Sequence, residues 1–291
     1  IPKFRISEQW GTPGSDDRKI IEMFTKKIKG STLSEKISSI NSFVAECDAA
    51  CAQAKTVDEI LANLVFLDSL ASVIYDFNPT TGGFLFESLI SALFGGSSRQ
   101  ITTGGGIDQD VTDIIDDQGR PMSLKFFFEG ASQYIKGSWD NLERDIVKAG
   151  QPMYYLIGIK NRAHRDHEVL AIDFYEFSVG AIEHDIEGDF DASDIGYGRG
   201  LGISAIIGTA KNRKRGGSAY HLGTLNFGSR QEIAGIAQNY ADSLGSTLVG
   251  LYEQIELLSR NVNEYFLDPP DSKDKVFSAQ ENTTQITKYL K

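Results

Sequence analysis

The sequence predicts a mixed α/β fold, and two features of its hydrophobic pattern support that prediction. Residues 16–77 and 229–267 carry apolar residues at intervals of three and four, which is typical of helices that bury one face. Residues 82–178 instead read as one helix, three strands, a second helix and two further strands. A sheet with helices on its faces is the expected core, with a helical segment before it and a long helix after it.

Composition narrows the class of protein. The chain has 291 residues, of which 41% are hydrophobic and 24% charged, as in ordinary globular proteins. No apolar run approaches the roughly 18–20 residues that cross a bilayer, so no membrane partner is expected. Cys47 and Cys51 have the spacing of neither a disulfide framework nor a C-x-x-C metal site, and we expect core residues in a reducing, cytoplasmic compartment.

The net charge of −11 argues against a general nucleic-acid coat protein. It allows a local basic surface, because phosphate binding depends on where the cations lie.

We expect five segments along the chain. In order, they are a helical segment at 1–80, an α/β core at 81–180, a loop-rich insertion with a basic loop at 181–228, a long helix at 229–267 and a polar tail at 268–291. Residues 34–54 and 56–77 predict two antiparallel helices that end at "NPTTGG". The core opens with the helix "FLFESLISALF", which Gly95 and Gly96 terminate.

The stretch "VTDIIDDQGRPMSLKFFF", residues 111–128, predicts a β-hairpin that carries charges inside its strands. A three-residue loop at Asp117–Gly119, with Gly119 left-handed, places Asp113 directly across from Ser123. Lys125 lies on the same face, because side chains alternate along a strand. The opposite face belongs to the core and holds Ile114, Met122, Leu124 and Phe126.

Residues 82–160 resemble the catalytic core of the PD-(D/E)XK nuclease superfamily, which has the restriction-endonuclease-like fold. That family has a helix bearing Glu, then a hairpin with Asp on one strand and (D/E)-x-K on the next. Here "GGFLFESLISALFGG" supplies Glu87, "DVTDII" supplies Asp113 and "SLK" supplies Lys125. The resemblance implies a mixed sheet flanked by helices and a metal-dependent nuclease site.

Ser123 departs from the family pattern, which usually has an acid there. Some members of the family with Ser at this position take a carboxylate from the following helix, and Asp140 and Glu143 in "SWDNLERD" stand where it would come from. Glu129 is a nearer candidate. Asp108 and Asp110 are alternative ligands that we interpret as loop acids.

The residue types suit phosphodiester hydrolysis independently of the family. Mg²⁺, with Mn²⁺ as a substitute, prefers hard oxygen ligands, and Asp113 and Glu87 would supply them. Lys125 would orient or deprotonate the attacking water. The alternative is structural: Asp113 and Lys125 form a cross-strand ion pair, and Glu87 is an acid favoured by the helix dipole.

Two basic stretches are candidates for binding DNA phosphates, although solvated loops are an equally good interpretation of each. They comprise Lys160, Arg162 and Arg165 in the first and Lys211, Arg213, Lys214 and Arg215 in the second. His164 and His167 lack a convincing third ligand, so we interpret them as surface residues.

The sequence therefore predicts a Mg²⁺-dependent DNA nuclease, of the type II restriction, repair or phage kind, and a homodimer that would cut two antiparallel strands. The rival hypothesis is a noncatalytic DNA-binding or structural protein on the same scaffold, such as a phage virion component, which would make the location phage-associated. No nucleotide cofactor is expected, because "TTGGGIDQD" lacks the P-loop lysine.

Overall fold

The computed structural model forms two compact units, residues 1–45 with 58–233 and residues 46–57 with 234–291. It describes residues 6–46, 56–75, 79–101, 111–128, 134–135, 139–162, 169–192, 201–202, 220–226, 230–267 and 273–289. Within these ranges no helix is long and apolar enough to cross a membrane.

The first unit is built on a mixed, seven-stranded sheet, as the α/β prediction required. Its strands, in spatial order, are β1 (Arg99–Gln100), β2 (Ile114–Ile115), β3 (Pro121–Phe128), β5 (Met153–Arg162), β6 (Val169–Gly180) and β7 (Phe190–Asp191), and β9 (Tyr220–Asn226) also pairs with β6. The first three strands are antiparallel, whereas β3 and β5 are parallel. A separate two-stranded sheet pairs β4 (Tyr134–Ile135) with β8 (Leu201–Gly202).

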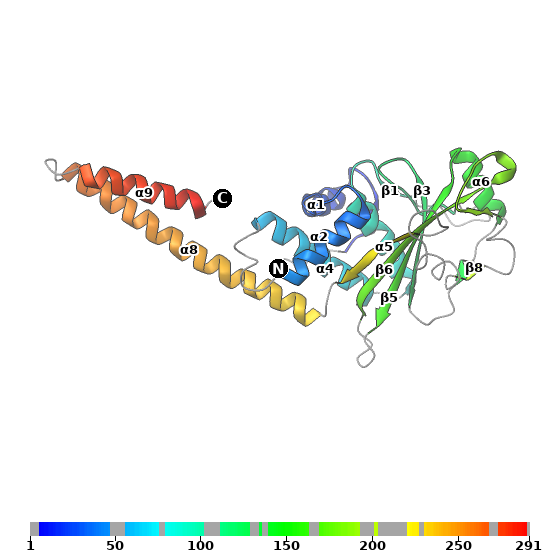
Figure 1. Cartoon of the computed structure of the whole chain (residues 1–291), viewed down its shortest axis with the longest axis horizontal. Coiled ribbons are helices and arrows are strands. Elements are labelled where there is room, and N and C mark those ends of the chain that lie inside the picture. Colours follow the sequence, from blue (N-terminus) through cyan, green and yellow to red (C-terminus); the bar gives the residue numbers. More distant parts are fainter. Residues whose placement is uncertain are drawn as a thin grey trace. The chain divides into compact units, whose positions relative to one another are not determined.

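Helices cover both faces of the sheet (Figure 1). The ring of Phe86 in α5 (Pro79–Phe94) stacks on Phe126 of β3, with 4.1 Å between centroids. On the other face Leu142 and Ile146 of α6 (Trp139–Ala149) join the buried cluster around Tyr155. Ser123 and Lys125 of β3 are in register with Tyr155 and Ile157 of that cluster, so they lie on the face that α6 covers.

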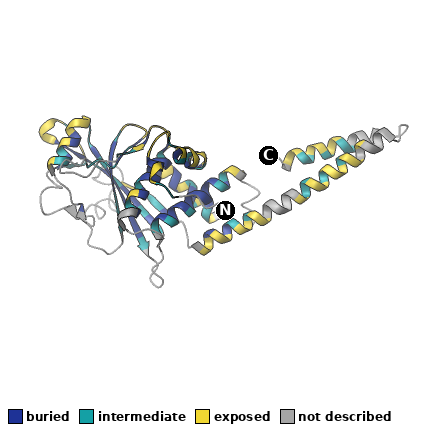
Figure 2. Ribbon diagram, turned by 180° about the vertical axis from the view of Figure 1, so that it is seen from behind, coloured by how far each residue is buried: buried dark blue, intermediate teal, exposed yellow. Residues whose placement is uncertain are grey.

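The N-terminal helices are α1 (Asp16–Thr25), α2 (Leu33–Glu46) and α4 (Val57–Tyr75), with the short 3₁₀ turn η1 (Glu8–Gly11) before them. Most described residues of α4 are buried, which agrees with a helix that is apolar on all sides (Figure 2). A second 3₁₀ turn, η2 (Ile182–His184), follows β6.

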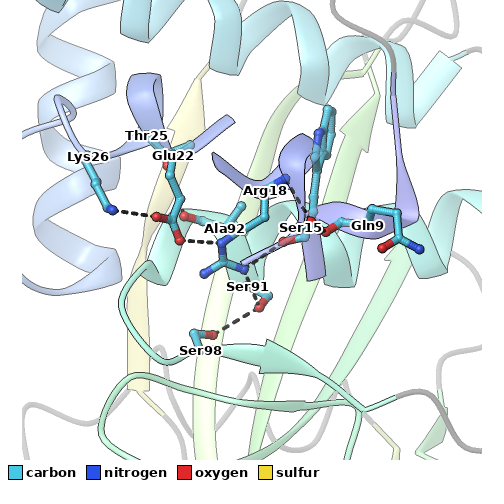
Figure 3. A network of polar contacts seen from close by, with 10 residues as sticks. Gln9, Ser15, Arg18, Glu22, Thr25, Lys26, Ser91, Ala92 and Ser98 are labelled. Atoms are coloured by element: carbon cyan, nitrogen blue, oxygen red, sulfur yellow. Dashed lines mark hydrogen bonds and ion pairs between the residues drawn. The ribbon is translucent and has the colours of Figure 1, made fainter. Parts of the chain in front are cut away.

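A buried arginine ties α1 to α5 (Figure 3). Arg18 is 1% exposed, and its Nη1 donates to the carbonyl of Trp10 at 2.7 Å and to Oγ of Ser91 at 3.2 Å. Its Nε donates to the carboxylate of Glu22, which also pairs with Lys26. This network fixes the helix that carries Glu87.

The free edge of β9 is covered by α2. Ser34 Oγ donates to the carbonyl of Leu222 at 2.6 Å, and Asn41 Nδ2 donates to the carbonyl of Thr224 at 2.7 Å. The side-chain oxygen of Asn41 accepts from the Asn226 N–H at 2.8 Å. These bonds occupy edge groups that could otherwise pair with a strand of another chain.

The second unit contains most of the predicted long helix, α8 (Arg230–Leu267), from residue 234 onward, and a helix that the sequence analysis missed. Residues expected to form a polar tail contain α9 (Lys273–Tyr289), which runs antiparallel beside α8 (Figure 1). Asn282 Nδ2 donates to Gln254 Oε1 at 2.9 Å between them. The prediction of a polar tail missed this helix because the segment has few apolar residues to reveal a helical period. Its residues nevertheless have adequate helix propensity.

Two expected helix boundaries were also wrong. The "NPTTGG" stretch was expected to lie between two helices, but α5 begins within it, at Pro79. Proline is well tolerated in the first turn of a helix, where its missing N–H has no intrahelical partner. The helix that starts near residue 34 begins at Leu33, with Thr32 Oγ1 accepting from the Glu35 N–H at 3.2 Å.

Candidate active site

The candidate site lies in a fork between β2 and β3. The hairpin has the predicted register, with Ile114 opposite Met122 and a left-handed Gly119 at φ 82° in the turn. In the described part of the chain β2 pairs with β3 only through residues 114 and 115, so β3 continues beyond Met122 without that neighbour. Asp113 immediately precedes β2 and therefore stands where the two strands separate.

The carboxylate of Asp113 is held by three donors from β3. Its Oδ2 accepts from Ser123 Oγ at 3.0 Å, from the Leu124 backbone N–H at 2.7 Å and from Lys125 Nζ at 3.1 Å. The bond to Leu124 replaces the ladder bond that β2 would have made. All three donors use Oδ2, so the carboxylate has a fixed orientation and no described donor occupies Oδ1.

Glu87 reaches the same fork from α5. Gln100 of β1 orients it, with Nε2 donating to Glu87 Oε2 at 2.9 Å, and Ser88 Oγ in turn donates to Gln100 Oε1 at 2.7 Å. The pKa of Glu87 is raised to about 7, chiefly by burial and also by the charge of Asp113, while Gln100 and Lys125 partly oppose the rise. The charges of Asp113 and Lys125 thus both affect the pKa of Glu87, and Asp113 and Lys125 are themselves in contact.

This pair of acids fits a hard divalent cation. Two carboxylates that repel each other in a partly buried site are relieved by a cation between them, and Mg²⁺ often uses only one or two protein carboxylates beside substrate phosphates and water. Ser123 is 0% exposed and donates to Asp113, so it helps to orient that carboxylate and adds no charge of its own.

The proposed replacement acids lie on α6 but do not complete a set of three. Glu143 is 3.3 Å from His184 Nε2, and Asp140 is exposed in the first turn. Among the residues described, no group of three His, Cys, Asp or Glu side chains could hold a metal ion. Asp108, Asp110 and Glu129 fall outside the described residues.

The expected basic stretch at 160–165 is not simply a loop. Lys160, Asn161 and Arg162 belong to β5, and Lys160 is 7% exposed with its Nζ 4.3 Å from the centroid of the Phe126 ring. This ammonium packs on an aromatic face in the core, so it is not presented to solvent as a phosphate ligand would be. The structure does not describe the side chain of Arg162. The remaining predicted DNA ligands also lie outside the described residues; they are Arg165, Lys211, Arg213, Lys214 and Arg215.

Sequence reasoning missed an acid that holds the strand entering the site. Asp145 of α6 is 5% exposed, and its Oδ2 accepts from the Val111 N–H at 2.6 Å, the Thr112 N–H at 3.2 Å and Thr112 Oγ1 at 3.3 Å. The sequence pattern that could have revealed Asp145 is its position on the apolar stripe of α6, next to Leu142 and Ile146.

A buried tyrosine, Tyr155, lies on the strand next to Ser123. Tyr155 of β5 is in register with Ser123, and it is 2% exposed. Burial raises the pKa of its hydroxyl, and the charges of Asp113 and Asp145 raise it further. Tyr155 therefore stays protonated, and so uncharged, at neutral pH.

No known protein family, curated protein or solved structure matches this chain. The functional assignment consequently rests on the site itself.

Proposed function

We propose that the chain is a Mg²⁺-dependent DNA nuclease of the PD-(D/E)XK type, with Glu87, Asp113 and Lys125 as its reactive centre. The observation that carries the proposal is the fixed Asp113 carboxylate, which contacts Lys125 Nζ at 3.1 Å and acts electrostatically on Glu87. Asp113 at the start of β2 and Lys125 of β3 are in direct contact, and Glu87 of α5 lies near enough for both charges to affect its pKa.

The topology supports the same proposal. Helix α5 bears Glu87, the β1–β2–β3 meander bears Asp113 and Lys125, and α6 then leads to the parallel strand β5. This is the order of elements that the family resemblance implied. Ser123 and Lys125 occupy the two positions of the (D/E)-x-K pattern, and Ser123 departs from it by carrying a hydroxyl where the family usually has an acid.

Each residue has a role in hydrolysis. Glu87 and Asp113 would hold the cation, which when bound neutralises the charge of the phosphate oxygens. Lys125 would orient the attacking water, whose oxygen bonds to phosphorus while the bond from phosphorus to the leaving oxygen breaks. One water proton leaves to solvent and the leaving oxygen gains one. Ser123 positions Asp113 without contacting the reacting atoms.

A second candidate function is DNA binding without cleavage on the same scaffold. The observation that favours it is the direct ion pair of Asp113 and Lys125 beside a buried, uncharged Ser123. An ion pair of this kind is also a common structural contact between strands.

Plasmid cleavage tests the proposal. The parent chain, Asp113→Ala and Lys125→Ala are incubated with supercoiled DNA and Mg²⁺, Mn²⁺ or EDTA. Cutting that needs the metal and disappears in both variants supports the nuclease. Equal nicking by all three preparations points to a contaminant, and DNA binding by the parent without any cutting supports the noncatalytic candidate.

A further inference from the structure

A cavity lies beside Asp113, on the sheet face that α6 covers. Its volume is about 250 Å³, near the lower limit of small-molecule pockets and therefore suited to one small unit of a ligand. The lining runs from β1 and β2 across to the last turn of α6 and includes Thr112, the residue before Asp113. We call it the α6–β1 cavity.

Strand register places this cavity on the same face as Lys125. Arg99 pairs with Ile115, and Ile115 pairs with Pro121, so the three side chains share one face. Pro121 precedes Ser123 by two residues along β3, a rise of about 6.6 Å, and Lys125 follows Ser123 by two more. The row of Arg99 is therefore the next row along the sheet from the row of Asp113.

Two cations stand at the cavity and have no acidic partner among the described residues. Arg99 extends from β1 and Lys148 from the last turn of α6, and both are exposed. By contrast, Lys19 and Lys26 of the same unit form salt bridges with nearby acids. Unpaired cations that converge on a concave site are a typical way of holding a phosphate.

The rest of the lining is divided between apolar and polar groups. Ile101, Ile115 and Pro121 form an apolar wall, against which a base or a sugar could pack. Thr112 and Asp145 supply a hydroxyl and a carboxylate. Because Asp145 already accepts from residues 111 and 112, and because its charge repels a phosphate, the phosphate belongs with Arg99 and Lys148.

We infer that the α6–β1 cavity binds one nucleotide unit of a DNA strand, the neighbour of the one cut at Asp113. This inference rests on the proposed nuclease function. A nucleotide within an intact duplex is stacked and paired, so it can enter a cavity only after it is displaced. The substrate class is accordingly single-stranded DNA or the frayed end of a duplex, in preference to a closed duplex.

Binding measurements with EDTA present test the inference separately from cleavage. A fluorescent single-stranded oligodeoxynucleotide and a sealed hairpin duplex of the same length are titrated with the parent, the double variant Arg99→Ala/Lys148→Ala and Ala149→Phe. The Phe side chain fills the cavity without altering the net charge, since Ala149 also lines it. Arg144→Ala is the matched control, because Arg144 is an exposed arginine of α6 outside the cavity lining.

The double variant should bind the single strand at least about tenfold more weakly, with the salt dependence of binding reduced by about one phosphate contact. Ala149→Phe should show a similar loss without the change in salt dependence, and Arg144→Ala should bind like the parent. A deoxynucleoside monophosphate should compete with the oligonucleotide.

Unchanged single-strand binding in both cavity variants, or binding of the free nucleotide but not of the strand, would overturn the inference. Circular dichroism spectra and melting curves establish that the variants are folded. If the parent cleaves DNA but the cavity variants bind normally, the inference alone fails. If the variants lose binding but the parent never cleaves, the proposed function fails instead.

Discussion

Lys125 and Asp113 lie across the β2–β3 fork from each other, with Nζ 3.1 Å from Oδ2, and the same oxygen accepts from the Leu124 N–H at 2.7 Å. This pairing gives the lysine a defined position although its side chain is 30% exposed. A cation bound at the free Oδ1 would leave the lysine contact intact, so the ion pair and the proposed chemistry are compatible.

Replacing the charge of either residue should abolish cleavage and change stability much less. We expect Asp113→Asn and Lys125→Met each to lower the rate of metal-dependent cleavage by about 10²–10⁴-fold, because each removes a group that acts at the reacting phosphate. Asp117→Asn, an exposed acid of the hairpin turn, is the control. Single-turnover cleavage rates check this, and a variant that retains the parental rate contradicts the assigned role.

Glu87 should make stability depend on pH. Its pKa is about 7 in the folded chain against an ordinary 4.5, so the folded state binds the proton more tightly than the unfolded state. The stabilising contribution of the protonated carboxyl is present below pH 4.5 and is lost as the pH rises to about 7. In urea titrations the parent should lose stability relative to Glu87→Gln over this range, and Mg²⁺ should reduce the loss.

A flat difference between the parent and Glu87→Gln from pH 4.5 to 7 would contradict the raised pKa of Glu87. The double variant Glu87→Gln/Asp113→Asn provides a reference that lacks both charges.

Asp145 should affect cleavage through the position of Asp113. Asp145→Ala removes the acceptor of the Val111 and Thr112 N–H groups, and we expect a loss of about 1–3 kcal/mol in the free energy of unfolding. The cleavage rate at saturating Mg²⁺ should fall, and more Mg²⁺ should be needed for half of the maximal rate. A loss of stability with unchanged Mg²⁺ dependence would mean a structural role alone.

Arg18 should be one of the most sensitive positions for stability. Arg18→Met leaves Glu22 and the carbonyl of Trp10 without their buried partner, and we expect a loss of about 3–5 kcal/mol. Lys19→Met, which removes the exposed pair of Lys19 with Asp16, should cost less than about 1 kcal/mol. Similar losses in the two variants would argue against a special role for the buried network.

The sequence predicted those features that depend on local rules. The turn Asp117–Gly119 fixed the register of the hairpin, and with it the convergence of Asp113, Ser123 and Lys125. Except for the two-residue strand β4, the order of helix and strands from α5 to β6 also followed from periodicity. Both depend on residues close in the chain, where turn geometry and alternation act directly.

Features that depend on distant contacts could not be predicted. Lys160 was read as a loop cation because basic residues follow it, but the Phe126 ring and the pairing of β5 with β3 hold it inside. The sequence did not predict strand β9, because Gly223 and the register shift at Phe174 interrupt the alternation of apolar and polar side chains along it. Its position is set by β6 and α2, which are remote in the sequence.

Titration of the parent chain with Mn²⁺ at pH 8, followed by electron paramagnetic resonance, tests the central claim most directly, because it asks whether Glu87 and Asp113 form one cation site. We expect a bound Mn²⁺ signal in the parent that Mg²⁺ displaces, and at least about tenfold weaker binding in Glu87→Gln and in Asp113→Asn. Equal Mn²⁺ binding by the parent and both variants, or no binding by the parent with DNA present, would contradict it.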